Sequence, residues 1–126
     1  WADMRIHHIA LGANDVAELA EFYRDVFGLA ELRRHHHDDN TLRSIWLKSG
    51  DVILMVEATE QPPRIIAGVG AGPFLLAFEV SPDEHTTYLD RLDERGVAVE
   101  DQTDYTSYFR DPEGNRVAVS HYPSTD

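Results

Sequence analysis

The sequence predicts an α+β domain in which one β-α-β-β-β unit occurs twice. Two amphipathic helical patterns are each preceded by one strand-like run and followed by several more, and turn residues separate these runs. We expect one domain over residues 4–122, with a first module at about 4–58, a linker at 59–73 and a second module at about 74–122. The strands are expected to form a curled mixed sheet around a cavity.

The first module has one helical pattern and four strand-like runs. Strands are expected at 5–11, 29–36, 42–48 and 51–57. Asn14 or Asp15 can cap the helix, which Gly28 ends. Its buried face is formed by residues at spacings of three and four, namely Val16, Leu19, Ala20, Tyr23, Val26 and Phe27. Ser49-Gly50 is expected as a two-residue hairpin turn that places Lys48 opposite Asp51.

The second module repeats the order. Strands are expected at 74–80, 97–99, 106–110 and 116–121. Ser81, Pro82 and Glu84 predict a capping box with proline at the first helical position, and Gly96 ends that helix. Its predicted buried face consists of Tyr88, Leu89 and Leu92.

Charge and composition exclude several classes of partner. The 126 residues include 23 acidic and 11 basic side chains, a formal net charge of −12. This charge repels phosphate backbones and anionic lipids, so we expect neither nucleic acid nor membrane as a partner. The sequence contains no cysteine, which excludes disulfides and thiolate metal sites and favours a cytoplasmic location.

Strand alternation indicates which side chains face away from the helices. In the first module His8, Trp46, Met55 and Glu57 share that face, and in the second module Glu79 does. An apolar lining with a few polar groups is typical of a small-molecule site, and we expect these residues to bind a ligand. Trp46 and Met55 are also typical of a packed core, and Glu57 of a solvated strand end.

Two segments resemble a known family. His8-Ile9-Ala10-Leu11, with the Asn14-Asp15 cap and the segment 21–29, resembles the opening of a glyoxalase/bleomycin-resistance/dioxygenase (vicinal oxygen chelate) domain. The segment 109–115 is similar to the last hairpin of that family. The resemblance implies the glyoxalase/bleomycin-resistance fold and a homodimer, whose modules pair either within one chain or between two chains. It does not select among the many functions of the superfamily.

The resemblance also implies metal ligands on the first and fourth strands of each module. Carried onto this sequence, they are His8 and Glu57 in the first module, whereas Leu75 and Ala118 occupy the other two positions. Leucine and alanine cannot coordinate a metal, and a tight zinc site needs three or four protein ligands. We therefore expect either no cofactor or a weakly held divalent metal such as Zn, Ni, Mn or Fe.

Two hypotheses follow. One is a small-molecule binding protein without a full metal site, similar to the bleomycin-resistance branch, with His8, Trp46, Met55, Glu57, Glu79 and Tyr108 as candidate ligand contacts. The alternative is a glyoxalase-like lyase or isomerase with His8 and Glu57 as catalytic residues, with or without a metal bound to them.

Three further features have interpretations of their own. Tyr108, three residues before Asp111, resembles the closing motif of ring-cleaving dioxygenases, but Ala118 replaces the glutamate ligand and makes ring cleavage unexpected. The segment 35–37, three histidines, is interpreted as a solvated strand end. Arg116 is a candidate partner for an anionic ligand if its register turns it toward the cavity.

Overall fold

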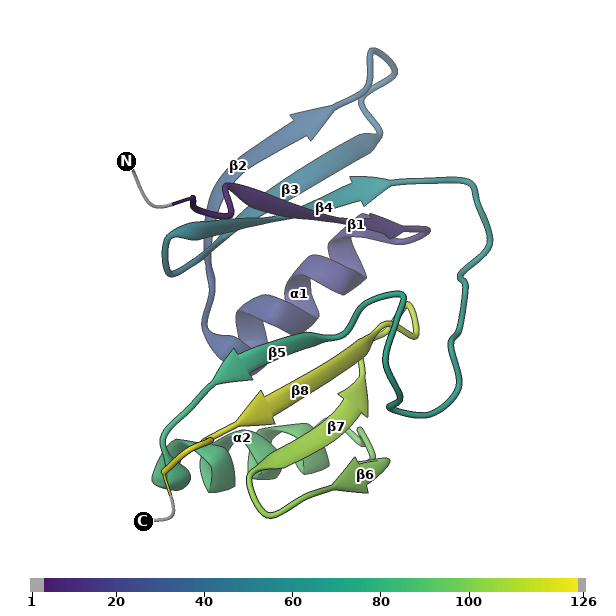
Figure 1. Ribbon diagram of the computed structural model, residues 1–126. Coiled ribbons are helices and arrows are strands. Elements are labelled where there is room, and N and C mark those ends of the chain that lie inside the picture. The colour runs from purple at the N-terminus through teal and green to yellow at the C-terminus, as the bar shows by residue number, and fades with distance from the viewer. Residues whose placement is uncertain (1–3, 125–126) are drawn as a thin grey trace. The chain divides into compact units, whose positions relative to one another are not determined.

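The computed structural model describes residues 4–124, which form two compact units divided between Pro63 and Arg64 (Figure 1). This boundary falls inside the predicted linker. Both units have the order β-α-β-β-β, so the predicted repeat is confirmed. No helix within the described residues is long and apolar enough to cross a membrane.

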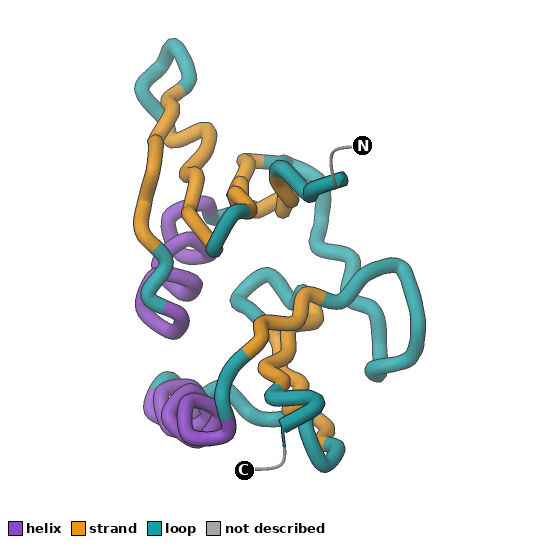
Figure 2. Tube along the Cα trace, turned by 60° about the vertical axis from the view of Figure 1, so that its left-hand side comes forward, coloured by secondary structure: helices purple, strands orange, loops and turns teal. Residues whose placement is uncertain are grey.

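Unit 1 is a four-stranded mixed sheet with a helix on one face (Figures 1 and 2). Its elements are β1 (His8–Ala13), α1 (Val16–Phe27), β2 (Ala30–His36), β3 (Leu42–Ser49) and β4 (Val52–Ala58). The strand order is β1-β4-β3-β2, in which β1 runs parallel to β4 and the other pairs are antiparallel. The apolar face of α1 packs against β3 and β4, and the strand residues buried in unit 1 are Leu11, Ala13, Ser44, Ile45, Leu47, Leu54 and Val56.

Both ends of α1 are fixed by local hydrogen bonds, as the sequence predicts. Asp15 is the N-cap, and its side chain accepts a hydrogen bond from the backbone N–H of Glu18 at 3.0 Å. Gly28 ends the helix at φ 68°, where its N–H donates to the carbonyl of Arg24 at 2.8 Å. A side chain at this left-handed position would be strained, so glycine terminates the helix.

The β3–β4 hairpin differs from its predicted register. Ser49 lies opposite Val52 and Trp46 opposite Met55, so the turn residues are Gly50 and Asp51, and the prediction of Ser49-Gly50 is wrong. Gly50 has φ 58°, and no other turn residue has a positive φ, a pattern that suits glycine at the first central position of a type II′ turn. In the observed register each residue of β3 lies opposite a residue of β4 two positions further along than predicted. Side chains alternate between the two faces with a period of two, so every side chain keeps its predicted face.

Unit 2 repeats the topology of unit 1. Its elements are β5 (Leu76–Glu79), α2 (Pro82–Glu94), β6 (Asp101–Gln102), β7 (Thr106–Arg110) and β8 (Arg116–Ser120), in the strand order β5-β8-β7-β6. The predicted capping box of α2 is present: Ser81 accepts from the N–H of Glu84, and the Glu84 carboxylate accepts from the N–H of Ser81.

The predicted strand at 97–99 is wrong. The backbone N–H of Val97 donates to the carbonyl of Leu92 at 2.9 Å. Val97 is therefore part of the hydrogen bonding that ends α2. Pairing with β7 begins only at Glu100, whose N–H donates to Tyr108, and the strand itself is Asp101–Gln102.

A buried arginine holds the segment before β5 against the sheet of unit 2. Arg116 is 5% exposed, and its guanidinium donates to the carbonyls of Gly68, Gly70, Gly72 and Phe74 at 2.6–3.4 Å. Its donors are thus used within the protein, and the idea that Arg116 pairs with an anionic ligand finds no support in this geometry. The same bonds fix the exposed loop to the start of β8 through its carbonyls.

A second buried polar group lies on the buried face of α2. His85 is 7% exposed and bridges two strands: its Nε2 is 2.8 Å from Ser107 Oγ of β7, and its Nδ1 is 2.8 Å from His121 Nδ1, just after β8. Burial, and in second place the neighbouring His121 ring, lower the pKa of His85 from its usual value of 6.5.

We expect Arg116→Met to lower the free energy of unfolding by about 2–3 kcal/mol, because several loop carbonyls lose a charged donor. Urea unfolding monitored by circular dichroism measures this change. Arg5→Met is the matched control. The Arg5 side chain is 77% exposed and forms a single long ion pair with Asp51 at 3.9 Å, so its loss should leave the unfolding midpoint unchanged. Equal midpoints for both variants would contradict the anchoring role.

We expect acid to destabilise the protein through His85. Because the folded-state pKa of His85 lies below the unfolded value, its stabilisation is complete above about pH 6.5 and is lost as the pH falls from there through the folded pKa. Urea unfolding between pH 7.5 and 5 should show a stability difference between wild type and His85→Gln that changes with pH by at most about 1.4 kcal/mol per pH unit. Parallel pH profiles of the two proteins would refute the assignment.

Candidate functional site

The helix-free face of unit 1 is the candidate site. It consists of the strand residues whose side chains point away from α1, and cross-strand pairing arranges them in three rows. The first row is His8, Ile53, Lys48 and Ala30; the second is Ala10, Met55, Trp46 and Arg33; the third is Gly12, Glu57, Ser44 and His35. The apolar centre of the second row is therefore flanked by rows that carry polar side chains.

The second row supplies an apolar surface and one unsatisfied donor. Trp46 and Met55 are half-buried and directly opposite each other. The indole Nε1 of Trp46 is buried and has no hydrogen-bond acceptor among the described residues. An unpaired buried N–H costs about 1–3 kcal/mol. Because protein atoms enclose this N–H, a ligand acceptor gains that energy only when a neighbouring side chain moves aside to admit it.

The third row contains a histidine that was not predicted to belong to the site. His35 Nδ1 lies 2.9 Å from Ser44 Oγ, and its ring packs on that of Trp46 with centroids 4.8 Å apart. The strand does end at His36, and His36 and His37 are exposed as predicted, but His35 is half-buried and hydrogen-bonded and departs from the prediction. Its alternation with the exposed His36 is the signal that could have placed it on this face.

His8 and Glu57 lie on the predicted face but not together. His8 pairs with Ile53, whereas Glu57 pairs with Gly12, four positions further along the strands. Four positions correspond to about 13 Å, so the two side chains belong to the opposite outer rows. The polar neighbour of His8 is instead His7, which precedes β1: the two Nδ1 atoms are 2.8 Å apart, and both residues are exposed.

The predicted residues of unit 2 lie on its own helix-free face, in two neighbouring rows. Tyr108 is half-buried in a row with Ala77 and Ala118, and exposed Glu79 is in the next row with Ser120. Ala118 is fully buried. Arg116 begins the same face, where the loop carbonyls bind it.

These residues do not fit a divalent metal centre. The two positions of unit 2 at which the resemblance implies metal ligands are Leu75 and Ala118, whose side chains have no donor atoms, and the register separates His8 from Glu57. Within residues 4–124 no group of three or more His, Cys, Asp or Glu side chains is placed to hold an ion. A tightly bound ion needs three or four such ligands.

Solved structures similar to this chain include a lyase and several fosfomycin resistance proteins. A lactoylglutathione lyase from Agrobacterium tumefaciens is 25% identical, with a TM-score of 0.71, over 94% of this chain and 93% of that one. A fosfomycin resistance protein, FosX, from Listeria monocytogenes, solved with Mn(II) and 1S,2S-dihydroxypropylphosphonic acid, is 14% identical with a TM-score of 0.79 over 95% and 94% of the two chains. FosX from Mesorhizobium loti is 13% identical with a TM-score of 0.79 over 98% and 96%. At these identities the FosX proteins show the fold alone.

The family is shown by sequence. No curated protein matches the chain, but a family model covers residues 5–119, from the strand that carries His8 to the last strand of unit 2. This range contains both repeated units and both of the motifs that resembled the family. The chain belongs to the Glyoxalase/Bleomycin resistance protein/Dioxygenase superfamily.

Proposed function

We infer that the protein binds a small molecule on the helix-free face of unit 1 and does so without a full metal site. The observation that carries this inference is the buried Trp46 Nε1 without an acceptor, at the centre of the face beside Met55. An apolar centre with polar groups on two sides is the usual composition of a small-molecule site.

The ligand would be an elongated molecule with an apolar middle. An acceptor on it would meet the indole N–H, its apolar part would cover Met55, and its polar ends would lie near His8 and Glu57, about 13 Å apart. The formal charge of −12 attracts cationic compounds to the protein as a whole. The face itself carries Lys48 and Arg33 beside Glu57, so the preference for a cationic compound rests on the whole chain and not on this face. Glu79 and Tyr108 are the corresponding candidate contacts in unit 2.

A metal-dependent lyase or isomerase that uses His8 and Glu57 is the second candidate. The 25% identity with a lactoylglutathione lyase over 94% of the chain favours it. The separation of the two residues in the sheet weighs against it. A homodimer in the cytoplasm is part of both proposals, supported by the family resemblance and by the lack of cysteine.

Binding can be measured through Trp46 itself. The sequence has two tryptophans, so Trp1→Phe leaves Trp46 as the single emitter. Titration with metal-free bleomycin, a cationic probe, should change its fluorescence in a saturable manner. Met55→Ala should weaken binding about tenfold, because the ligand loses part of an apolar contact, whereas Glu94→Ala, exposed on α2, should have no effect.

The same samples separate the two candidates. We expect no stoichiometric metal by elemental analysis after purification without chelator, and no turnover of S-lactoylglutathione or fosfomycin with added Mn²⁺, Ni²⁺ or Zn²⁺. One bound ion per chain that is lost in both His8→Ala and Glu57→Gln would establish the metal-dependent alternative. If fluorescence does not respond to bleomycin, the cationic assignment of the ligand is wrong.

A further inference from the structure

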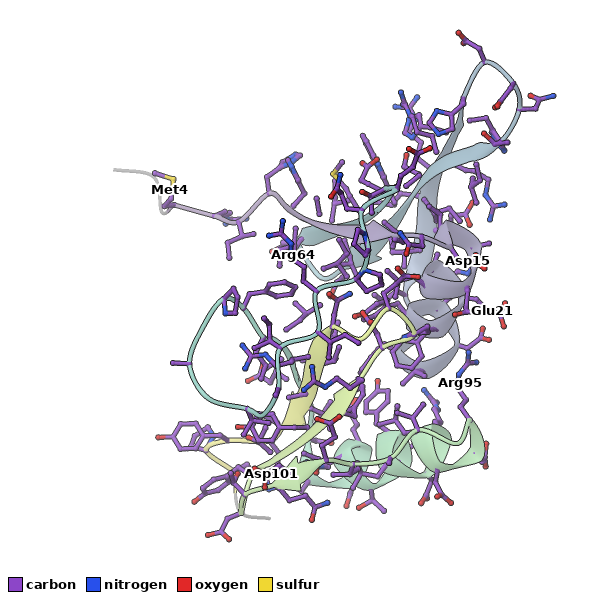
Figure 3. All side chains as sticks on the ribbon, turned by 90° about the vertical axis from the view of Figure 1, so that its right-hand side faces the viewer. Met4, Asp15, Glu21, Arg64, Arg95 and Asp101 are labelled. Atoms are coloured by element: carbon purple, nitrogen blue, oxygen red, sulfur yellow. The ribbon has the colours of Figure 1, made fainter. Side chains whose placement is uncertain are left out.

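Unit 2 contains a cavity that Arg116 lines and that none of the other candidate site residues lines. Its volume is about 230 Å³, and its walls are Ile66, Pro73 and Phe74 of the loop before β5, residues 114–116 of the β7–β8 hairpin, and Arg64. Arg64 is labelled in Figure 3. The cavity lies within unit 2, so its shape is determined by that unit.

The loop that forms the outer wall is fixed at two points. At one point Ile65 packs on Gly114: a Cβ added there would lie 2.9 Å from Ile65 Cγ1, and Gly114 has φ +84°, so the contact requires glycine. At the other point the Arg116 guanidinium holds the carbonyls of Gly72 and Phe74 at 2.6 and 2.8 Å. The cavity is therefore preformed.

Two polar side chains of the cavity already form hydrogen bonds within the protein, and a third does not. Arg116 donates to loop carbonyls, and the Asn115 side chain donates to Asp111 Oδ2 at 2.9 Å. Arg64 forms no hydrogen bond or ion pair with any other residue between positions 4 and 124. The cavity thus offers one free guanidinium, which is suited to bind a planar anionic group through two donors.

The apolar walls are open to a ligand. Phe74 is 49% and Ile66 37% exposed, an unusual degree of exposure for large apolar side chains beside a cavity. A cavity of about 150 Å³ holds benzene, so a volume of about 230 Å³ accommodates a ring together with a carboxylate. The net negative charge of the protein acts over a Debye length of about 8 Å and does not cancel a contact made directly to the guanidinium.

We propose that this cavity binds a small monoanion with a compact apolar body, of the aromatic or branched aliphatic carboxylate class. The anionic group pairs with Arg64, and the apolar body lies between Ile66 and Phe74. The proposal does not depend on ligand binding in unit 1, because the two sets of residues do not overlap.

Benzoate and its neutral analogue benzamide test the proposal on the full chain. Two-dimensional ¹H–¹⁵N NMR titrations should show benzoate binding with a dissociation constant on the order of 1 mM, with shifts at Gly114 and Asn115, and benzamide binding at least tenfold more weakly. Arg64→Gln should remove the preference for benzoate, and Arg64→Lys should keep part of it. Phe74→Ala should weaken both compounds, and Arg5→Gln, at another exposed arginine, should change neither.

Several results would overturn the assignment. Equal affinity of benzoate and benzamide, unchanged benzoate binding in Arg64→Gln, or no binding at 10 mM would each do so. Shifts confined to His8, Trp46 and Met55 would place the anion in unit 1 and refute a site in unit 2. Inorganic phosphate carries negative charge without an apolar body and serves as the control for charge alone. If phosphate binds as tightly as benzoate, the apolar walls do not contribute to binding.

Discussion

Each unit has one helix, which covers only one of the two faces of its sheet, and the proposed ligand contacts of unit 1 lie on the face that its helix does not cover. In unit 1 the alternation of β3 and β4 turns Ile45, Leu47, Leu54 and Val56 toward α1, where they are buried. The same alternation leaves Trp46 and Met55 on the other side, half-buried and opposite each other. Side chains that pack against α1 in the core cannot contact a ligand. The candidate site residues are therefore those on the opposite face of the sheet.

Pairing between strands then decides which of the available residues can act together. His8 and Glu57 are chemically suited to hold one metal ion, but β1 pairs with β4 in a register that places them four positions apart. Glu57 instead shares a row with Ser44, which His35 binds. The face therefore has an apolar middle and separated polar ends, an arrangement that suits contact with a ligand better than coordination of a metal ion.

The two arginines that line the cavity of unit 2, Arg64 and Arg116, differ in role because they differ in burial. Arg116 is buried at the start of β8, and the carbonyls of the loop bind its donors. Arg64 also lines the cavity, and its guanidinium has no hydrogen bond or ion pair with another residue in the described range 4–124. Residue type alone suggested Arg116 for contact with an anion, whereas burial gives it a structural role and leaves the binding role to Arg64.

The repeat, both helices and the strand faces could be predicted from sequence because they rest on local rules: Asp15 and Ser81 cap the helices, Gly28 ends one, and apolar residues recur at fixed spacings. The register of the β3–β4 hairpin could not, because Ser49-Gly50 and Gly50-Asp51 both fit a two-residue turn. Only the cross-strand pairing of Ser49 with Val52 decides between them.

Among the candidate site residues, the faces of His8, Trp46, Met55 and Glu57 followed from alternation, but their rows depend on non-local pairing. His85 was missed although it precedes Tyr88, Leu89 and Leu92 by three, four and seven positions and so belongs to the buried stripe of α2. Its partner His121 lies 36 residues away in sequence, and no local pattern connects the two.

The central claim is that Trp46 and Met55 lie on the face of the unit 1 sheet away from α1. Nuclear Overhauser effects from the Met55 methyl group test it most directly. The account predicts contacts to the Trp46 ring and to Ala10, the neighbours of Met55 across the sheet, and none to Leu19 or Tyr23 of α1. Contacts from Met55 to Leu19 and Tyr23, without contacts to Trp46, would contradict it.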